Sequence, residues 1–595
     1  MEKIKTYGID LGTTYSAIAH LDDTGRPEII DNPDDPSTLL ASAVYFQEGG
    51  VPVVGMQAKE EAEMYPDRVV QFIKREIGKE DAFPREYDDQ TYNAVEISSL
   101  ILKRIVEYAN AQGHDVKNVI ITCPAYFGND EREATKQAGQ LAGLNVLELI
   151  NEPTAAAYNF LSKEFKENKK ILVYDLGGGT FDVSYIDYIV DGEKTVVDVR
   201  CSDGNDRLGG KDWDDRLFSY LKELYIGDPA NDCDSNKFDE DFDLRQLVRN
   251  KVEDTKKALS ARDKTSVRIE NTRLEVQKDK FEERTKDLLQ QTIDVVNFVL
   301  KTADADKDAV DLVLLVGGST KMPMVKNAVK AMFGDEKVRE EDPDKAVAKG
   351  AALAAAAKVD GLLQEVFSMF SKGGGDSDEE SDQIEANKGF EILADLVGES
   401  AAEEIANLSG DDLATAVAEI TPAVPTAFEG GMKVLDRLPR SFGPRVAQFG
   451  NNLVSYVDNL IFMDQVVPVE MTKTYSVQSD NAPMIRTALY ENRAVEGSPP
   501  IHLTEADGSD AHLDPALQVK NLGEVTMPLP PGTPKGTAIE VTIHAKLSGI
   551  ELFLKNPATG EVEKLERDSE YILSREEFEQ SKQKIAAIET TGEVG

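Results

Sequence analysis

The amino-acid sequence predicts a two-lobed α/β domain followed by a β-sandwich, and three observations support this fold class. A glycine-rich loop pattern occurs twice, at residues 8–14 and 173–180, each time between two apolar strands. A strand that leads into a helix also occurs twice, at residues 118–124 and 311–318. After residue 440 the pattern changes to short alternating strands separated by Gly and Pro turns, which is typical of a sandwich.

Each copy of the loop places an aspartate, Asp10 or Asp175, where a strand ends, so that its carboxylate can face a metal. The glycines that follow have no Cβ, which allows backbone N–H groups to approach phosphate oxygens closely. The next strands, 16–20 and 181–186, begin at once, so both loops are expected at hairpin tips. A Walker loop is not matched, because residues 209–212 fail its spacing and lack its hydroxyl. The duplication therefore predicts a nucleotide clamp of another kind.

Two helix starts repeat in the same order, at residues 151–153 and 342–344, and each combines an acidic residue with proline. Proline is favoured in the first helical turn, and an acidic neighbour suits the positive end of the helix dipole. A single start of this kind would indicate only an ordinary capped helix. The repeated order of strand, loop, strand and capped helix instead favours a duplicated unit.

Composition limits the classes of function. The chain has 595 residues, 41% of them hydrophobic, which allows three or four domains. Its formal net charge of −43 disfavours nucleic acid and anionic membranes as partners. Cys123, Cys201 and Cys233 form no C-x-x-C pair, and no apolar run approaches the roughly 18 residues of a membrane span. We therefore expect a cytoplasmic protein without disulfides, zinc or a membrane anchor.

Five motifs of this sequence are similar to those of the 70-kilodalton heat-shock chaperone family. They lie, in order, at residues 9–16, 124–127, 151–157, 174–182 and 316–320. The resemblance covers residues 1–359, and five motifs in order are far more specific than one glycine-rich loop. It implies an actin-like (ribonuclease H-like) two-lobed ATPase domain that binds ATP and Mg²⁺ between its lobes. It also implies a peptide-binding domain downstream.

The resemblance implies a role for each catalytic residue. Asp10 and Asp175 would hold Mg²⁺ through bound waters, because this ion gives up its hydration shell reluctantly. Lys74 would meet the γ-phosphate and the attacking water, Glu152 would accept from that water network, and Thr180 would orient it. From pattern alone, Lys74 would be a solvated helix lysine.

A larger set of residues is implied to bind the nucleotide. Glu253, Lys256 and Ser260 share one helical face, although the bare pattern favours a charged surface stripe. Lys321 stands where the family has an arginine against adenine, so lower affinity is expected. The full set is Gly12, Thr13, Thr14, Tyr15, Gly177, Gly178, Gly179, Gly209, Gly210, Glu253, Lys256, Ser260, Gly317, Gly318, Ser319, Lys321 and Asp344.

Changes in composition along the chain predict its organisation. Residues 372–382 have the signature of a flexible acidic spacer, and residues 390–418 carry apolar side chains at helical spacing. Ser574 and Glu577 form a capping-box pattern for a helix toward Ile588, and the family's large helical lid is expected to be absent. The expected units are the ATPase domain (1–359), an acidic linker and Ala-rich helical insert (360–432), an interdomain linker (433–440), the sandwich (441–566) and a short helix or tail (567–595).

Peptide binding is expected in the sandwich, by strand augmentation around an apolar pocket. The resemblance assigns this role to Tyr475, Gln478, Ile485 and Thr487, with Ile485 lining the pocket. Gln478 and Thr487 stand where the family prefers small or aliphatic residues, so a less apolar or more specific client is expected. A degenerate sandwich that serves only as an interaction module is the alternative.

The expected function is that of an ATP-hydrolysing chaperone whose nucleotide state sets its affinity for unfolded or extended polypeptides. Pro124 and Arg132 match the family's relay between the ATP site and the linker. The implied partners are polypeptide clients, a J-domain co-chaperone and a nucleotide exchange factor, and a monomer is expected. Two alternatives are an ATP-binding regulatory scaffold with weak turnover and, less favoured because of the sandwich, a small-molecule kinase of the actin-like superfamily.

Overall fold

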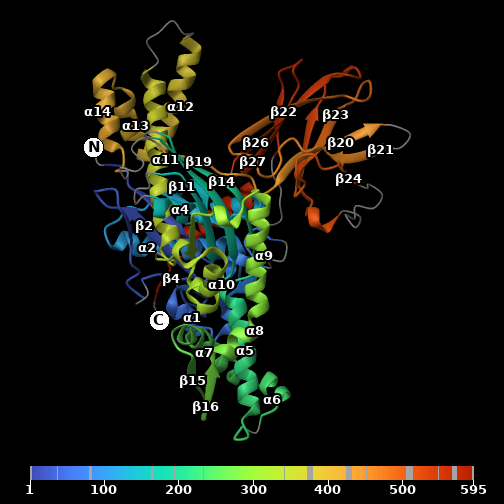
Figure 1. Ribbon diagram of the computed structural model, residues 1–595. Helices are drawn as coiled ribbons and strands as arrows, with labels where there is room; N and C mark the ends of the chain where they lie inside the picture. The colour runs from blue at the N-terminus through green and yellow to red at the C-terminus, as the bar shows by residue number, and fades with distance from the viewer. Residues whose placement is uncertain are drawn as a thin grey trace.

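A computed structural model describes most of the chain as two lobes, a helical protrusion and a sandwich (Figure 1). Lobe I comprises residues 3–161, and lobe II comprises residues 167–345 together with strand β19. The described residues are 3–35, 38–79, 84–161, 167–191, 194–231, 233–340, 342–371, 379–423, 432–449, 453–503, 514–546, 549–565 and 572–592.

Lobe I is built on a mixed sheet in the order β11-β10-β1-β2-β3, with β4 paired to β2. Helices α2 and α3 share a core with this sheet, and α1 packs on a small sheet of order β6-β5-β7. The elements are β1 (Thr6–Asp10), β2 (Tyr15–Leu21), β3 (Pro27–Ile29), β4 (Leu40–Ala41), β5 (Ala43–Tyr45), β6 (Val53–Val54), α1 (Met56–Glu61), η1 (Pro66–Arg68), β7 (Val69–Gln71), η2 (Ile73–Arg75), β8 (Arg85–Tyr87), β9 (Gln90–Tyr92), α2 (Ala94–Ala111), β10 (Asn118–Cys123), α3 (Asn129–Leu141) and β11 (Asn145–Asn151).

Lobe II repeats the arrangement with a sheet in the order β18-β17-β12-β13-β14-β19. In both lobes the glycine-rich loop joins two antiparallel strands, β1 to β2 and β12 to β13, which confirms the expected hairpins. The elements are β12 (Lys169–Leu176), β13 (Phe181–Asp191), β14 (Lys194–Asn205), α5 (Gly210–Gly227), α6 (Ser235–Glu240), α7 (Phe242–Ala261), β15 (Lys264–Ile269), β16 (Thr272–Gln277), α8 (Lys278–Arg284), α9 (Lys286–Thr302), η3 (Lys307–Ala309), β17 (Leu312–Val316), η4 (Gly318–Lys321), α10 (Pro323–Phe333), η5 (Asp335–Lys337) and β18 (Val338–Glu340).

Two helices, α4 (Glu152–Leu161) and α11 (Ala346–Ser371), form the layer between the two sheets. They are rich in alanine because they lie very close together. A Cβ added to Gly350 of α11 would lie 1.6 Å from the Ala155 carbonyl oxygen of α4, and one added to Gly8 of β1 would lie 2.0 Å from the Ala352 nitrogen. Glycine therefore sets the spacing of strand and helices at the centre of the domain.

The end of the first domain differs from expectation, because α11 continues past residue 359 to Ser371. The expected flexible spacer is also wrong for residues 379–382, which begin helix α12 (Glu379–Val397), while residues 372–378 lie outside the described part. Burial explains both differences: Leu363 and Val366 of α11 share a core with Leu393 of α12. With α13 (Glu399–Ala406) and α14 (Gly410–Ile420), this pair forms the expected helical insert, a protrusion on lobe I (Figure 1).

The expected interdomain linker begins as a strand of lobe II. Strand β19 (Met432–Leu435) pairs in parallel with residues Thr195 to Asp198 of β14 and extends the sheet by one strand. Its backbone groups thus find partners that a free linker would leave to water. The connection to the sandwich starts only after Leu435.

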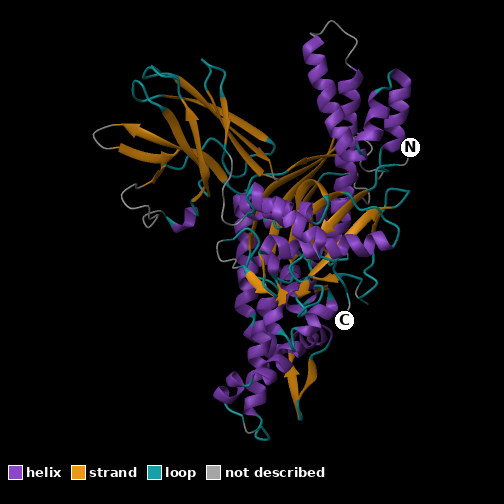
Figure 2. Cartoon of the chain, turned by 180° about the vertical axis from the view of Figure 1, so that it is seen from behind, coloured by secondary structure: helices purple, strands orange, loops and turns teal. Residues whose placement is uncertain are grey.

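The sandwich consists of two antiparallel sheets, in the orders β24-β21-β20-β23-β25 and β22-β26-β27-β28, around one apolar core (Figure 2). The alternating strands expected after residue 440 are confirmed, among them β22, β23, β26 and β27, as is the capping box of α15. The elements are β20 (Ser441–Phe449), β21 (Leu453–Val457), β22 (Val469–Ser476), β23 (Met484–Asn492), β24 (Ile501–Leu503), η7 (Pro515–Leu517), β25 (Lys520–Pro528), β26 (Ala538–Lys546), β27 (Gly549–Lys555), β28 (Val562–Lys564) and α15 (Arg575–Ala587).

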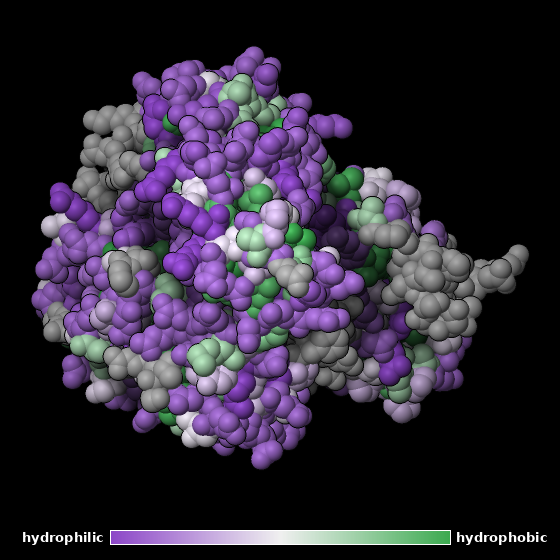
Figure 3. All heavy atoms as spheres, turned by 90° about the horizontal axis from the view of Figure 1, so that it is seen from below, coloured by the Kyte–Doolittle hydropathy of each residue, from purple (hydrophilic) through white to green (hydrophobic). Residues whose placement is uncertain are grey.

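The surface agrees with the acidic composition. The face in Figure 3 is mostly hydrophilic, with apolar residues in narrow patches. Among the described residues, no helix is both long and apolar enough to cross a bilayer.

We predict that Gly350→Ala destabilises the protein by about 3 kcal/mol, because the added methyl group would overpack α11 against α4. The matched control is Gly361→Ala on the same helix, where a Cβ would meet no atom within 4 Å. That change should raise stability by roughly 0.5 to 1 kcal/mol, since alanine favours helix more than glycine does. Urea denaturation midpoints measure both, and equal effects would contradict this account of the helical layer.

Candidate functional site

The two aspartates of the repeated loops lie at the facing ends of β1 and β12. The side chain of Asp175 is buried, and the Thr122 hydroxyl donates a hydrogen bond of 3.1 Å to Asp10. Asp182, just after the second loop, is also buried and accepts a 2.9 Å hydrogen bond from the Ala125 N–H. Three carboxyl groups from two sheets are thus placed by backbone geometry and not by exposed, flexible loops.

Lys74 is not a solvated lysine. It lies in η2, only 3% exposed, and pairs with Glu152, which begins α4 and is also buried. Desolvation alone would lower the pKa of a lysine; here Glu152 and Asp10 overcome it and raise the pKa of Lys74. Lys74 therefore remains protonated at the base of the site.

Negative charge exceeds positive charge at this point. Burial, reinforced by Glu152, raises the pKa of Asp10 to about 7, and burial with the same neighbour raises the pKa values of Asp175 and Asp182 well above the usual range. A hard divalent cation such as Mg²⁺ fits this set of oxygen donors, because it would stabilise the ionised carboxylates. Among the described residues, no group of three His, Cys, Asp or Glu side chains is placed to hold a metal ion directly.

The two glycine-rich loops touch across the lobes. A Cβ on Gly178 would lie 1.9 Å from the Thr14 Oγ1 atom, and a Cβ on Gly179 would lie 2.2 Å from Thr13 Cγ2. Gly209 lies against Gly179, where a Cβ would approach the backbone to 2.5 Å. Gly12, Gly177 and Thr180 complete these loops, and the Gly177 N–H donates a 3.0 Å hydrogen bond to the Thr180 carbonyl. Only glycine at positions 178 and 179 leaves room for the Thr14 and Thr13 side chains to lie this close to the second loop.

Helix α7 carries three of the expected side chains, and two of them, Glu253 and Lys256, contact other residues of the expected set. Glu253 is bonded to Tyr15 across the lobes, Lys256 donates to the Gly210 carbonyl at 3.1 Å, and the Ser260 hydroxyl donates to the Lys256 carbonyl at 3.1 Å. A neighbouring group is formed by Gly317, Gly318, Ser319, Lys321 and Asp344, in which Ser319 donates to the Gly177 carbonyl at 2.8 Å and Lys321 pairs with Asp344. The structure thus brings most of the expected residues around the loops.

Some residues of the site were missed by sequence reasoning. Lys59 of α1 bridges the lobes through a 2.5 Å ion pair with Glu253, and it lies in a charged helix that gives no signal of its role. Thr122 orients Asp10 from a buried strand, where it looks like any other β-branched residue. Asp182 could have been found, because it belongs to the motif at residues 174–182.

A hydrogen-bonded path leads from the site to the chain after β19. The Arg132 guanidinium donates to Asn151 Oδ1 at 2.7 Å, and Asn151 Nδ2 donates to Asp436 Oδ1 at 3.2 Å. Thr154 donates to the same oxygen at 3.2 Å, and Arg132 also contacts the Pro124 carbonyl at 3.5 Å. Every member of the path is buried; Pro124 contributes its backbone carbonyl, and the others contribute side chains.

The four residues assigned to peptide binding lie on β22, its following turn and β23. Tyr475 donates to Asp458 at 2.7 Å, and Ile485 packs against the sandwich core. The exposed Gln478 side chain donates to the Ser476 carbonyl, whereas the Thr487 hydroxyl is buried and donates to the Arg445 carbonyl at 2.7 Å. The polar groups of this set are therefore engaged within the sandwich.

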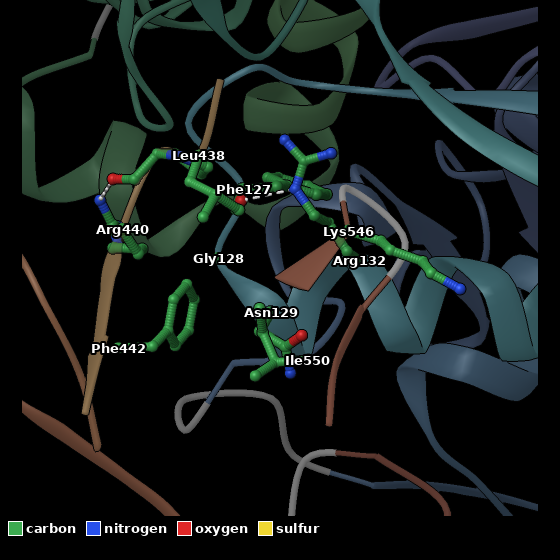
Figure 4. A pocket seen from close by; sticks show the side chains of 10 residues that line it. Phe127, Gly128, Asn129, Arg132, Leu438, Arg440, Phe442, Lys546 and Ile550 are labelled. Atoms are coloured by element: carbon green, nitrogen blue, oxygen red, sulfur yellow. Dashed lines mark hydrogen bonds between the residues drawn. The ribbon is translucent and has the colours of Figure 1, made fainter. Parts of the chain in front are cut away.

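A pocket lies between lobe I and the sandwich (Figure 4). Phe127 and Asn129 contribute from lobe I, Leu438 and Phe442 from the chain after β19, and Ile550 from β27. The side-chain nitrogen of Asn129 (Nδ2) is buried there and has no hydrogen-bond partner among the described residues. The two domains thus meet around a small gap and are not packed throughout.

Two sheets that carry matching loops on either side of α4 and α11 define an actin-like ATPase domain, and antiparallel sheets consistent with a substrate-binding β-sandwich follow it. Residues 6–366 match the family model described as Hsp70 protein, and the chain belongs to this family. The chain is 40% identical over 362 residues to "Chaperone protein DnaK" of Thermotoga neapolitana and 38% identical over 361 residues to that of Thermosipho melanesiensis. The matches cover 59% of this chain and 59% and 58% of the relatives, so the chain spans about three fifths of their length.

We predict that Lys59→Met speeds release of a bound nucleotide about tenfold, because it removes a half-buried, charge-assisted contact between the lobes. Lys257→Met is the matched control, since Lys257 bonds the same Glu253 at 2.8 Å but belongs to the same helix. Stopped-flow displacement of a fluorescent ATP analogue measures both rates. Equal rates in the two variants would show that the bridge does not hold the lobes.

The contact of Asp436 predicts a pH dependence. Burial raises the pKa of Asp436 to about 6 from the ordinary value of 3.8. The docked chain thus binds the proton more tightly, so docking is strongest below the ordinary pKa and weakens as pH rises through about 6. Asp436→Asn keeps an acceptor oxygen and should remove this trend. Hydrogen exchange of the β19 amides at pH 5.5 and 7.5, corrected for intrinsic rates, measures how docking depends on pH. The same pH dependence in the parent and in Asp436→Asn would assign the effect to another group.

Proposed function

We propose that this protein is an ATP-dependent molecular chaperone. Binding and hydrolysis of ATP between the lobes would change the affinity of the sandwich for unfolded or extended polypeptide segments. Membership of the Hsp70 family supports the ATPase part, and the relatives named above are chaperones by title. The sandwich lies outside the region of similarity, so its clients, and a J-domain co-chaperone or exchange factor, are part of the proposal.

The site residues would share the work of hydrolysis. Asp10 and Asp175 would hold the hydrated Mg²⁺, which supplies charge neutralisation to the β- and γ-phosphates. Lys74, kept protonated by Glu152, would face the γ-phosphate, and Glu152 would accept a hydrogen bond from the attacking water's network. Thr180 would orient that water. The touching loops would part by a small movement of the lobes to admit phosphate between their backbone N–H groups.

The observation that carries the coupling is the position of Asn151 beside Glu152. Glu152 bonds Lys74 in the site, while Asn151, one residue earlier, bonds Asp436 after β19. A shift at the start of α4 would therefore be felt at both places, without a long chain of contacts. Arg132 braces Asn151 and would pass on the same movement.

The second candidate is a regulatory scaffold that binds ATP and turns it over poorly. One observation favours it: the Thr487 side chain is buried and bonded to the Arg445 carbonyl, so it is not presented to a client. A small-molecule kinase is less favoured, because a domain of antiparallel sheets follows the clamp. Measuring the rate of ATP hydrolysis with and without an unfolded peptide separates the three. The peptide should raise the rate of a chaperone, a scaffold should hydrolyse ATP slowly in both conditions, and the rate of a kinase should not depend on the peptide.

We predict that Asp10→Asn or Asp175→Asn lowers single-turnover ATP hydrolysis about 100-fold or more, because each removes a charge that would position the metal at the transition state. Asp243→Asn is the control, since Asp243 is an exposed carboxylate on α7. Circular dichroism should show that all three variants fold. Turnover at the parent rate in both site variants would refute the assignment of these carboxylates.

A further inference from the structure

The turn that carries Lys74 has a strained backbone. Phe72, directly before η2, has φ of 60° and ψ of 24°, which lies in the left-handed region. Among the described residues it is the only aromatic residue with a positive φ. A bulky side chain is strained there, and such strain persists only where the surrounding structure holds it. Among the described residues, the lobe I core includes the next residue, Ile73, but not the Phe72 ring.

The ring of Phe72 is contacted from the other lobe, by Lys211 at the start of α5. The Lys211 ammonium nitrogen lies 5.6 Å from the centroid of this ring, within the range of a cation–π interaction. Asp215, on the next turn of α5, bonds the same nitrogen at 2.7 Å and fixes its direction. The Lys211 side chain thus reaches from lobe II to the strained turn of lobe I.

The other end of the turn is held by the same part of lobe II. Arg75 Nε donates to the Gly179 carbonyl at 2.8 Å, and Arg75 Nη2 donates to Asp212 at 2.7 Å. The turn itself is closed by the Arg75 N–H, which donates to the Phe72 carbonyl at 2.9 Å. Lys74 lies between these two residues. The start of α5 therefore holds the turn on both sides of Lys74.

The start of α5 is also fixed to the second glycine-rich loop, because the Lys211 N–H donates to the Gly178 carbonyl at 2.8 Å. A displacement of this loop would therefore displace Lys211. The turn at Phe72 would follow, and with it the ammonium group of Lys74. These contacts thus connect the loop expected at the phosphates with the lysine expected at the γ-phosphate.

We propose that Lys211 is a positioning residue for Lys74, which it places in the site by holding the strained turn at Phe72. The proposal rests on the proposed function, to which it adds a side chain that acts without touching the reacting atoms. A residue that orients a catalytic group, and does not bind the nucleotide, changes the rate of the chemical step more than the affinity.

Single-turnover hydrolysis and ATP affinity of the full chain test this role. Lys211→Met keeps an unbranched apolar side chain and removes the charge. It should lower the hydrolysis rate about tenfold and leave the dissociation constant of ATP within about twofold of the parent value. Lys211→Arg keeps a cation for the ring and should restore the rate to within about threefold of the parent.

The chain offers a matched control on the same helix. Lys222 of α5 lies 5.4 Å from the centroid of the Phe238 ring and pairs with Asp239 at 2.6 Å, away from the turn of Lys74. Lys222→Met therefore removes the same kind of contact. Its hydrolysis rate should stay within about twofold of the parent rate.

Hydrogen exchange measures the contact without turnover. The Arg75 amide closes the turn, so in nucleotide-free protein Lys211→Met should speed its exchange about fivefold, whereas Lys222→Met should leave it within about twofold. Phe72→Leu removes the ring and keeps an apolar side chain, and it should speed the same exchange as Lys211→Met does. The double variant should add little, because both changes remove one contact.

Three outcomes would overturn the proposal. A loss of ATP affinity in Lys211→Met at an unchanged hydrolysis rate would make Lys211 a nucleotide-binding residue. Equal rates of hydrolysis or of Arg75 exchange in Lys211→Met and Lys222→Met would show that Lys211 does not position Lys74. Additive effects of Lys211→Met and Phe72→Leu would show that the two side chains act separately. If the parent hydrolyses no ATP, the proposed function fails, and the exchange rates still decide whether Lys211 holds the turn.

Discussion

The structure depends on an excess of buried negative charge at the point where the two lobes meet. Asp10, Glu152, Asp175 and Asp182 lie there with one ammonium group, that of Lys74. Burial raises the pKa values of the three aspartates, which means that the folded chain destabilises its own ionised carboxylates. A hydrated divalent cation and its phosphate ligand would relieve this cost. The fold therefore favours binding of the cation at this position.

The same place explains why the domains can communicate. Asn151 is the last residue of β11, and Glu152 is the first residue of α4. The Glu152 side chain lies in the charge cluster, whereas the Asn151 side chain bonds Asp436 after β19. Since α4 is packed against α11 with no room for a methyl group at Gly350, a local change in the shape of either helix would disturb this packing.

Much of this arrangement could be predicted from local patterns. The duplicated loops, the helix start at residues 151–153 and the alternating strands of the sandwich depend on neighbouring residues, and they were expected at the correct places. The second helix begins at Ala346, two residues after the expected start at residues 342–344. Lys74 illustrates the limit. Its local sequence suggests a solvated side chain, and only the resemblance to a family assigned it to the nucleotide site. Its buried ion pair with Glu152 is seen only in the structure. The acidic start of α12 gave the opposite error. Its charge predicted a flexible spacer, but the buried side chain of Leu393 stabilises a helix there.

The sequence by itself therefore determined the class of fold, the positions of the loops and the two aspartates at their strand ends, because these follow from periodicity and from the chemistry of short motifs. The tertiary structure alone decided that β19 joins lobe II, that Lys59 forms an ion pair between the lobes and that residues 572–592 pack on lobe I. These contacts join residues far apart in the chain, such as Glu96 and Lys584. Such pairs form by complementary burial and charge only after the chain has collapsed. No local sequence pattern therefore predicts them.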